Sequence, residues 1–159
     1  MNTARQWALP DRLVELIESG FWPNRENVNQ QNLRGLVDAD LVREFAAEED
    51  QIFFDAPPFA LISSLVANGE KFWNREEANP SGLSHEHSIV IGDFGIGSDA
   101  PIVLDYSSDP KNPEVKRLKW GSSFSENQWV TAAKDFETMC RILNLPTTKK
   151  EDGDAEPVA

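Results

Sequence analysis

The chain has 159 residues, of which 27 are acidic and 15 are basic, so its formal net charge at pH 7 is -12. A field of this sign repels phosphate backbones and anionic headgroups, which argues against nucleic acids and membranes as partners and favours a cation or a basic protein. The alternative, which we favour over a steering role, is that the acidity only confers solubility. The length fits a single domain with its own core. One cysteine, Cys140, permits no intrachain disulfide, and the N-terminus lacks an apolar signal core. The sequence therefore predicts a cytoplasmic protein.

Short helices alternate with a brief strand in the first half of the chain. Pro10 suits a first helical turn, and the apolar spacing that follows it ends at Gly20, a typical helix stop. The same reasoning predicts helices over residues 10–20, 39–48 and 61–66. A short strand is expected over residues 52–54, because Pro57 and Pro58 follow it directly.

The centre of the chain predicts an antiparallel meander of strands over residues 88–94, 102–107 and 114–120. The first two of these carry apolar side chains on both faces, which is typical of central strands covered on each side. A glycine-bearing connection between them favours a hairpin. Because the turn is short, we expect a positive φ at Gly95 or Gly97.

A long helix is expected to close the domain, over residues 129–143. The apolar residues there recur at steps of three and four, a pattern typical of a helix face that packs on a core: Trp129, Ala132, Ala133, Phe136, Cys140 and Leu143. Helices, then strands, then a helix indicate an α+β domain over residues 1–146. Residues 147–159 have little to bury and are expected to form a disordered acidic tail.

The conspicuous motifs of the chain give weak support to an enzyme. Residues 92–97 read Gly-Asp-Phe-Gly-Ile-Gly, but the glycines are in the reverse order of a dinucleotide fingerprint and a strand follows where that site needs a helix. His85 and His87 are candidate zinc ligands, although no third ligand stands at a telling spacing. Cys140 lies on an apolar stripe. We therefore predict no catalytic residue, no cofactor and no metal, with the histidine pair as the weak metal candidate.

Acidic and aromatic residues are the better candidates for a binding surface. Asp93, Asp99 and Asp109 cluster in sequence around the predicted hairpin, where they would suit arginines of a partner. The alternative is that they cap turns, which we favour for Asp93. Trp22 and Trp73 lie in irregular segments and are candidate hot spots, with stapling of a loop to the core as the alternative that we favour for each.

An ordered series of short motifs resembles the Smi/Knr branch of the SUKH superfamily. Its most specific part is the glycine–aspartate hairpin of residues 91–99, followed by Ile-Val-Leu-Asp-Tyr at residues 102–106. The weaker parts are Trp-Ala-Leu-Pro at 7–10, Gly-Phe-Trp-Pro at 20–23, Pro-Pro-Phe at 57–59, Phe-Trp at 72–73 and Asn-Gln-Trp-Val at 127–130. The helix after Pro10 departs from the family pattern, since it carries no aromatic residue.

This resemblance implies a twisted, mainly antiparallel sheet flanked by helices, and a function without catalysis. Bacterial members look like immunity proteins that bind and neutralise toxins, often nucleases, so the resemblance implies a toxin domain as the partner. A regulatory interaction domain of a housekeeping network is the alternative, since eukaryotic members resemble scaffolds. A small metal-dependent hydrolase built around His85 and His87 is a third hypothesis.

Overall fold

The computed structural model describes residues 7–24, 37–80, 82–95, 100–123 and 126–147. Its α-helices are α1 (Asp11–Ser19), α3 (Ala39–Phe45), α4 (Ile62–Ala67) and α5 (Phe136–Leu143). Its strands are β1 (Phe53–Phe54), β2 (Ser88–Asp93), β3 (Pro101–Asp105), β4 (Glu114–Lys119) and β5 (Gln128–Ala133). Short 3-10 helices are η2 (Phe72–Asn74), η3 (Glu76–Ala78) and η4 (His85–His87). The predicted tail lies outside the described residues, apart from Thr147.

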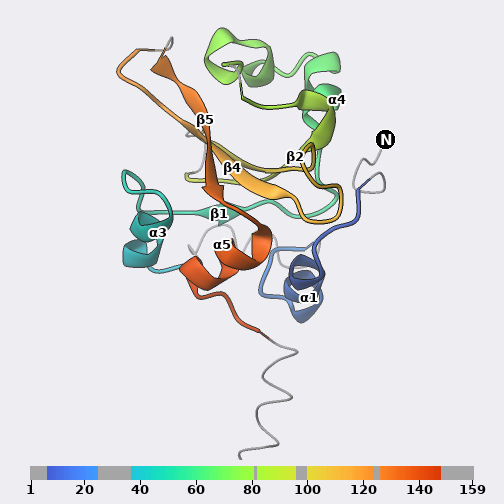
Figure 1. Ribbon diagram of the computed structural model, residues 1–159, viewed down its shortest axis with the longest axis vertical. Helices are drawn as coiled ribbons and strands as arrows, with labels where there is room; N and C mark the ends of the chain where they lie inside the picture. The colour runs from blue at the N-terminus through green and yellow to red at the C-terminus, as the bar shows by residue number, and fades with distance from the viewer. Residues whose placement is uncertain (1–6, 25–36, 81, 96–99, 124–125, 148–159) are drawn as a thin grey trace, which may run out of the picture.

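The five strands form one antiparallel sheet in the order β1-β2-β3-β4-β5 (Figure 1). The predicted hairpin of β2 and β3 is confirmed, with Ser88 opposite Asp105 at one end and Asp93 opposite Pro101 at the other. Both strands lie inside the sheet, as their two-sided apolarity predicts. The α+β class is thereby confirmed.

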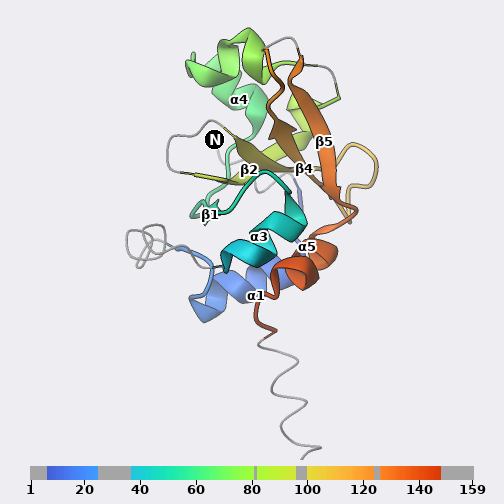
Figure 2. The ribbon, with the colours of Figure 1, turned by 90° about the vertical axis from the view of Figure 1, so that its left-hand side faces the viewer.

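Helices cover both faces of the sheet. Figures 1 and 2 show α1, α3 and α5 on one side and α4 on the other. The larger core lies under the first group, and a smaller core lies under α4 and η2. In β3 the side chains alternate between the two, since Ile102 and Leu104 face the larger core and Val103 the smaller one. No helix in the described part of the chain is long and apolar enough to cross a bilayer.

Two helix ends show how local sequence sets the elements. Gly20 follows α1 with a φ of 87°, and its N–H donates to the carbonyl of Ile17, so the predicted glycine stop is confirmed. At α5 the carboxylate of Asp135 accepts a hydrogen bond of 2.8 Å from the N–H of Thr138. Positive φ values among the described glycines also occur at Gly69 and Gly82. Gly95 is not among these glycines and Gly97 lies outside the described residues, so a left-handed glycine at position 97 stays a prediction.

The predicted helix over residues 129–143 is wrong in its first part. Gln128–Ala133 is the strand β5, which pairs with β4, and the helix begins only at Phe136. Tryptophan, valine and threonine favour a strand, and pairing with β4 decides the matter. Trp129 packs into the smaller core and Ala133 into the larger one, so the two residues do not share a helix face.

Candidate functional site

An acidic pocket opens beside the β1 edge of the sheet, with a volume of about 250 Å³. Three carboxylate residues and two aromatic residues contribute to its wall. The lining consists of Asp55, Glu70, Phe72, Trp73, Val90, Gly92, Asp93 and Pro101. We name this feature the acidic pocket.

The pairing of β1 with β2 brings two of the carboxylates together. Phe53 lies opposite Asp93 and Phe54 opposite Gly92, and the N–H of Asp55 donates to the carbonyl of Ile91 over 2.8 Å. Asp55 therefore continues the β1 edge, two residues beyond the partner of Asp93. A side chain on Gly92 would not fit this pairing, because its Cβ would lie 2.6 Å from the carbonyl oxygen of Phe53. The close approach of the two strands thus depends on glycine.

The charges of these residues act on one another. Desolvation in the pocket, and then the negative charge of Asp93, raise the pKa of Asp55 to about 6. Desolvation, with contributions from Glu48 and Asp93, also raises the pKa of Glu49 above its usual value. Asp55 is nevertheless exposed at the surface, so solvent screening limits the energetic effect of its shift. The negative charges at the β1 edge therefore lie close enough to repel one another.

Replacing Asp55 by asparagine is expected to flatten the dependence of stability on pH. The pKa of Asp55 is raised on folding, so its contribution to stability is full below the ordinary value of 3.8 and is lost as the pH rises through about 6. The Asp55→Asn protein should then be more stable than wild type at neutral pH, by less than about 1 kcal/mol because the residue is exposed. Urea denaturation across this pH range measures the effect. Identical profiles for the variant and wild type would contradict it, and Asp50→Asn, nearby and exposed, serves as control.

The carboxylate of Asp93 also holds the turn that follows β2. Its Oδ1 accepts from the N–H of Gly95 over 3.0 Å, and its Oδ2 accepts from the N–H of Ala100 over 3.2 Å. This is the capping function that the sequence favours for Asp93. The same residue lines the acidic pocket, so it contributes charge there while it fixes the hairpin.

The predicted grouping of hairpin carboxylates is not reproduced as one surface. Asp109 follows the far end of β3, whereas Asp93 pairs with Pro101 at its beginning. The carboxylate of Asp109 caps its own turn, accepting from the N–H of Lys111 over 2.9 Å. Asp99 lies outside the described residues. Of the three predicted carboxylates, the structure places Asp93 in the pocket.

Trp22 is a core residue, which corrects its place as a candidate contact. Its side chain is fully buried, it stacks on Phe54 with ring centroids 4.0 Å apart, and its Nε1 donates to the carbonyl of Asp55 over 2.8 Å. A side chain without exposed surface has none to offer a partner. Trp22 therefore staples its segment to the core, which is the alternative favoured from the sequence, and its indole holds the backbone carbonyl of Asp55.

Trp73 is also nearly buried, at 7% exposure, yet it reaches the pocket wall. Its ring stacks on Trp129 with centroids 5.9 Å apart and an interplanar angle of 9°, while Phe72 meets it edge-on. The segment between α4 and β2 thus presents two aromatic side chains beside the carboxylates. The aromatic wall is held rigidly from the smaller core.

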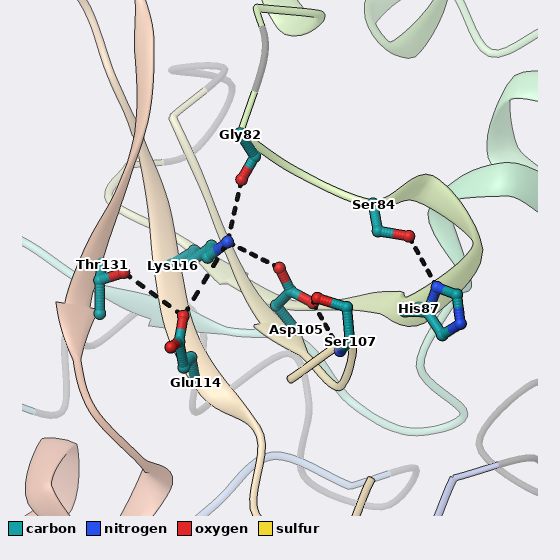
Figure 3. A network of polar contacts seen from close by, with 8 residues as sticks. All are labelled: Gly82, Ser84, His87, Asp105, Ser107, Glu114, Lys116 and Thr131. Atoms are coloured by element: carbon teal, nitrogen blue, oxygen red, sulfur yellow. Dashed lines mark hydrogen bonds and ion pairs between the residues drawn. The ribbon is translucent and has the colours of Figure 1, made fainter. Parts of the chain in front are cut away.

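The histidine pair lies on η4, just before β2. The Nδ1 of His87 is 2.7 Å from the hydroxyl of Ser84 (Figure 3). The ring of His87 also packs near that of Trp7. No group of three or more histidine, cysteine, aspartate or glutamate side chains within the described ranges is arranged to hold a metal ion. Cys140 is buried in α5, and desolvation raises the pKa of its thiol to about 12.

A buried ion pair next to this region was not anticipated from the sequence. Asp105, 2% exposed, faces Lys116 across β3 and β4 with 2.8 Å between Oδ2 and Nζ (Figure 3). The ammonium also donates to the carbonyl of Gly82, and the Oδ1 of Asp105 accepts from the N–H and hydroxyl of Ser107. Burial alone would raise the pKa of Asp105, but the hydrogen bonds from Lys116 and Ser107 outweigh it and lower that pKa. These partners all belong to the chain itself, so the network is part of the fold of the sheet and not of the acidic pocket.

Asp55 and Glu70 are the site residues that the sequence analysis missed. The available signal for Asp55 was its position directly after the short strand and before two prolines, where charges often guard an edge. Glu70 follows the end of α4 and carries no comparable signal. Both reach the pocket only through the pairing of distant segments.

Comparisons with known proteins do not place the chain in a family. No protein-family model, no curated protein and no solved structure matches it. The SUKH resemblance accordingly stays a prediction from the sequence.

Proposed function

We propose that this chain is a non-catalytic protein-binding domain of the immunity type, which blocks a basic toxin in the cytoplasm by direct contact. The observation that carries the proposal is the acidic pocket, where Asp55, Glu70 and Asp93 stand beside an aromatic wall. The immunity function comes from the SUKH resemblance, and the pocket supplies a chemistry for the contact. A nuclease toxin suits this chemistry, because carboxylates can occupy the basic groove that phosphates would otherwise fill.

The side chain that fits the pocket best is arginine. Carboxylates accept hydrogen bonds from a guanidinium in pairs, and aromatic faces stack on its plane. The raised pKa of Asp55 means that negative charge there is costly in the free protein, and an arriving cation would relieve that cost. A volume of about 250 Å³ is small for a cofactor but adequate for one long side chain.

The charge of the whole chain acts in the same direction. A net charge of -12 attracts a basic protein at a distance and speeds its encounter with the pocket. Added salt weakens such steering, because at physiological ionic strength it screens exposed charges that are more than roughly 8 Å apart. Binding that depends on the pocket and on steering should therefore weaken with added salt.

In the first experiment the purified chain captures its partner from the native organism, and mass spectrometry identifies that partner. We expect a basic protein, and its toxicity on expression should be suppressed when this chain is co-expressed. The product of a neighbouring gene is the first protein to test for toxicity. A captured partner that is acidic, or that this chain fails to neutralise, would overturn the proposal.

Removing the charge of Glu70 is expected to weaken binding of that partner. Glu70→Gln and Glu18→Gln remove the same charge from exposed glutamates, one in the pocket and one on α1, across the sheet. We expect the pocket variant to raise the dissociation constant about tenfold, a loss of about 1.4 kcal/mol, and to lessen its dependence on salt. The α1 variant should stay within about twofold of wild type. Titration calorimetry at low and physiological salt measures both, and equal effects would contradict a role for the pocket.

A further inference from the structure

The strand β5 forms the edge of the sheet opposite β1 (Figure 1). Among the described residues it pairs with β4 alone. An edge strand leaves a row of backbone N–H and C=O groups unpaired, and these can accept a strand from another chain. Proteins usually guard such an edge with charged residues, prolines, very short strands or a bulge.

The two edges of this sheet are guarded very differently. β1 has two residues, and Asp55 and two prolines follow it closely. β5 has six residues, Gln-Trp-Val-Thr-Ala-Ala, without a charge or a proline. A register shift opposite Val115 and Lys116 disturbs the end of β5, but residues 128–131 pair with β4 in unbroken register. Four consecutive residues therefore form a regular, uncharged edge, which Gly82 approaches at Trp129, where a Cβ on Gly82 would lie 3.5 Å from the backbone carbonyl oxygen.

An exposed aromatic residue and a recess lie beside the start of this edge. Trp120, directly after β4, is 37% exposed, and Lys119 before it pairs with Gln128 of β5. A hollow of about 320 Å³ lies at this corner, lined by Lys119, Trp120, Gly121, Glu126 and Gln128. Exposed tryptophan is the residue most enriched at binding hot spots. The β5 edge and this corner together form what we name the β5 surface.

We propose that the β5 surface binds a second copy of this chain, with the two β5 strands antiparallel about a two-fold axis so that one sheet runs through both copies. Strand pairing of this kind uses backbone groups, and an uncharged strand meets its copy without burying a charge. The side chains around the edge carry both signs, since Lys119 and Lys134 stand with Glu126, and a two-fold axis can set opposite signs against each other.

Charge argues against a basic partner at β5 and against a second copy at β1. β5 carries no acidic residue, so it offers a basic partner nothing specific, whereas the acidic pocket lies on the β1 side of the sheet. A second copy at β1 would meet Glu49, Asp55 and Asp93 with its own acids, and like charges would oppose the contact. The neutral edge is thus the place where a chain with a net charge of -12 can meet itself.

The test measures the molar mass of the purified chain by sedimentation across protein concentration and salt. We expect a reversible dimer of twice 17.8 kDa whose affinity rises with salt, because screening weakens the repulsion between two acidic copies. Partner binding at the acidic pocket is expected to weaken with salt, so failure of one proposal leaves the other standing. A monomer up to near-millimolar concentration would overturn the dimer.

Two matched variants locate the contact. Gln128 on β5 and Gln51 just before β1 are both exposed, and Gln→Lys adds the same charge at each. We expect Gln128→Lys to weaken dimerisation on the order of tenfold, because a charged edge strand resists pairing, and Gln51→Lys to leave it near wild type. Thr131→Lys, also exposed on β5, should reproduce the first result. Equal effects of Gln128→Lys and Gln51→Lys would place the contact elsewhere, and circular dichroism confirms that each variant is folded.

Discussion

Replacing Lys116 by methionine is expected to lower the free energy of unfolding by about 3–5 kcal/mol, because it leaves a buried carboxylate without its cation. The carboxylate is that of Asp105, which is 2% exposed and lies 2.8 Å from the ammonium. Methionine preserves most of the length and apolar stem of lysine, so the loss reports the charge and the hydrogen bond to Gly82, and not a cavity. Urea denaturation at neutral pH measures it.

The dependence of that loss on pH identifies Asp105 as its cause. In wild type the pKa of Asp105 is lowered, so its contribution to stability is present above its ordinary value of 3.8 and is lost as the pH falls below it. Without Lys116 the remaining burial raises that pKa, and Asp105 takes up a proton more readily as the solution becomes acidic. The difference between Lys116→Met and wild type should therefore shrink as the pH is lowered towards 4.

A matched control comes from the same strand. Lys119 is exposed, and Lys119→Met removes the same charge from β4 without uncovering a buried carboxylate. Its effect should stay within about 0.5 kcal/mol. If the two lysine variants lose the same stability, or if the loss at Lys116 does not change with pH, the Asp105–Lys116 pair is not what stabilises this part of the sheet.

The central strands were predictable because their unbroken apolar composition indicates burial on both faces. Ile89 and Ile91 face the larger core and Val103 faces the smaller one. A strand that is buried on both faces carries apolar side chains at successive positions. The end of α1 was predictable for a similarly local reason, since Gly20 adopts the left-handed conformation that glycine accepts easily. Local sequence signals were sufficient where the conformation depended on one residue or on the composition of one strand.

The error at β5 shows where local signals stop. Trp129 and Ala133 are four residues apart, the spacing of a helix face, but a register shift in β5 sends them to opposite faces of the sheet. Whether such a segment forms a helix or a strand depends on β4, which lies earlier in the chain and supplies the hydrogen bonds. The residues of the β5 segment alone do not indicate that β4 will pair with it.

The acidic pocket was predictable in kind but not in membership. The excess of acids pointed to an acidic contact surface, and Asp93 was among the candidates. Asp55 and Glu70 were not, because their proximity arises from the pairing of β1 with β2 and from the segment after α4. The tryptophans show the converse: Trp22 looks like a hot spot by residue type, yet its burial is a property of the whole fold.

Replacing Trp22 by alanine is expected to destabilise the domain by about 3–5 kcal/mol, enough to unfold much of a marginally stable protein. The indole is fully buried, stacks on Phe54, and donates a hydrogen bond to the carbonyl of Asp55, so alanine removes apolar contacts and leaves that carbonyl without its donor. Trp22→Phe keeps an aromatic ring at the stack and should cost less, about 1–3 kcal/mol, for the lost donor and the smaller ring. Thermal and urea denaturation measure both variants.

The exposed Trp120 supplies the matched control, since Trp120→Ala makes the same chemical change where the side chain is 37% exposed. At protein concentrations low enough to keep the chain monomeric, we expect that variant to stay within about 0.5 kcal/mol of wild type. A hot spot at Trp22 would give the reverse result, with unchanged stability and weaker binding of the basic partner. If Trp22 is a core residue, its replacement lowers the free energy of unfolding instead. Any weaker binding of the partner by Trp22→Phe should then come only from a shift in the backbone of Asp55. If Trp22→Ala unfolds at the same urea concentration as wild type, the core position of Trp22 is wrong, and so is the account of how Asp55 is held at the acidic pocket.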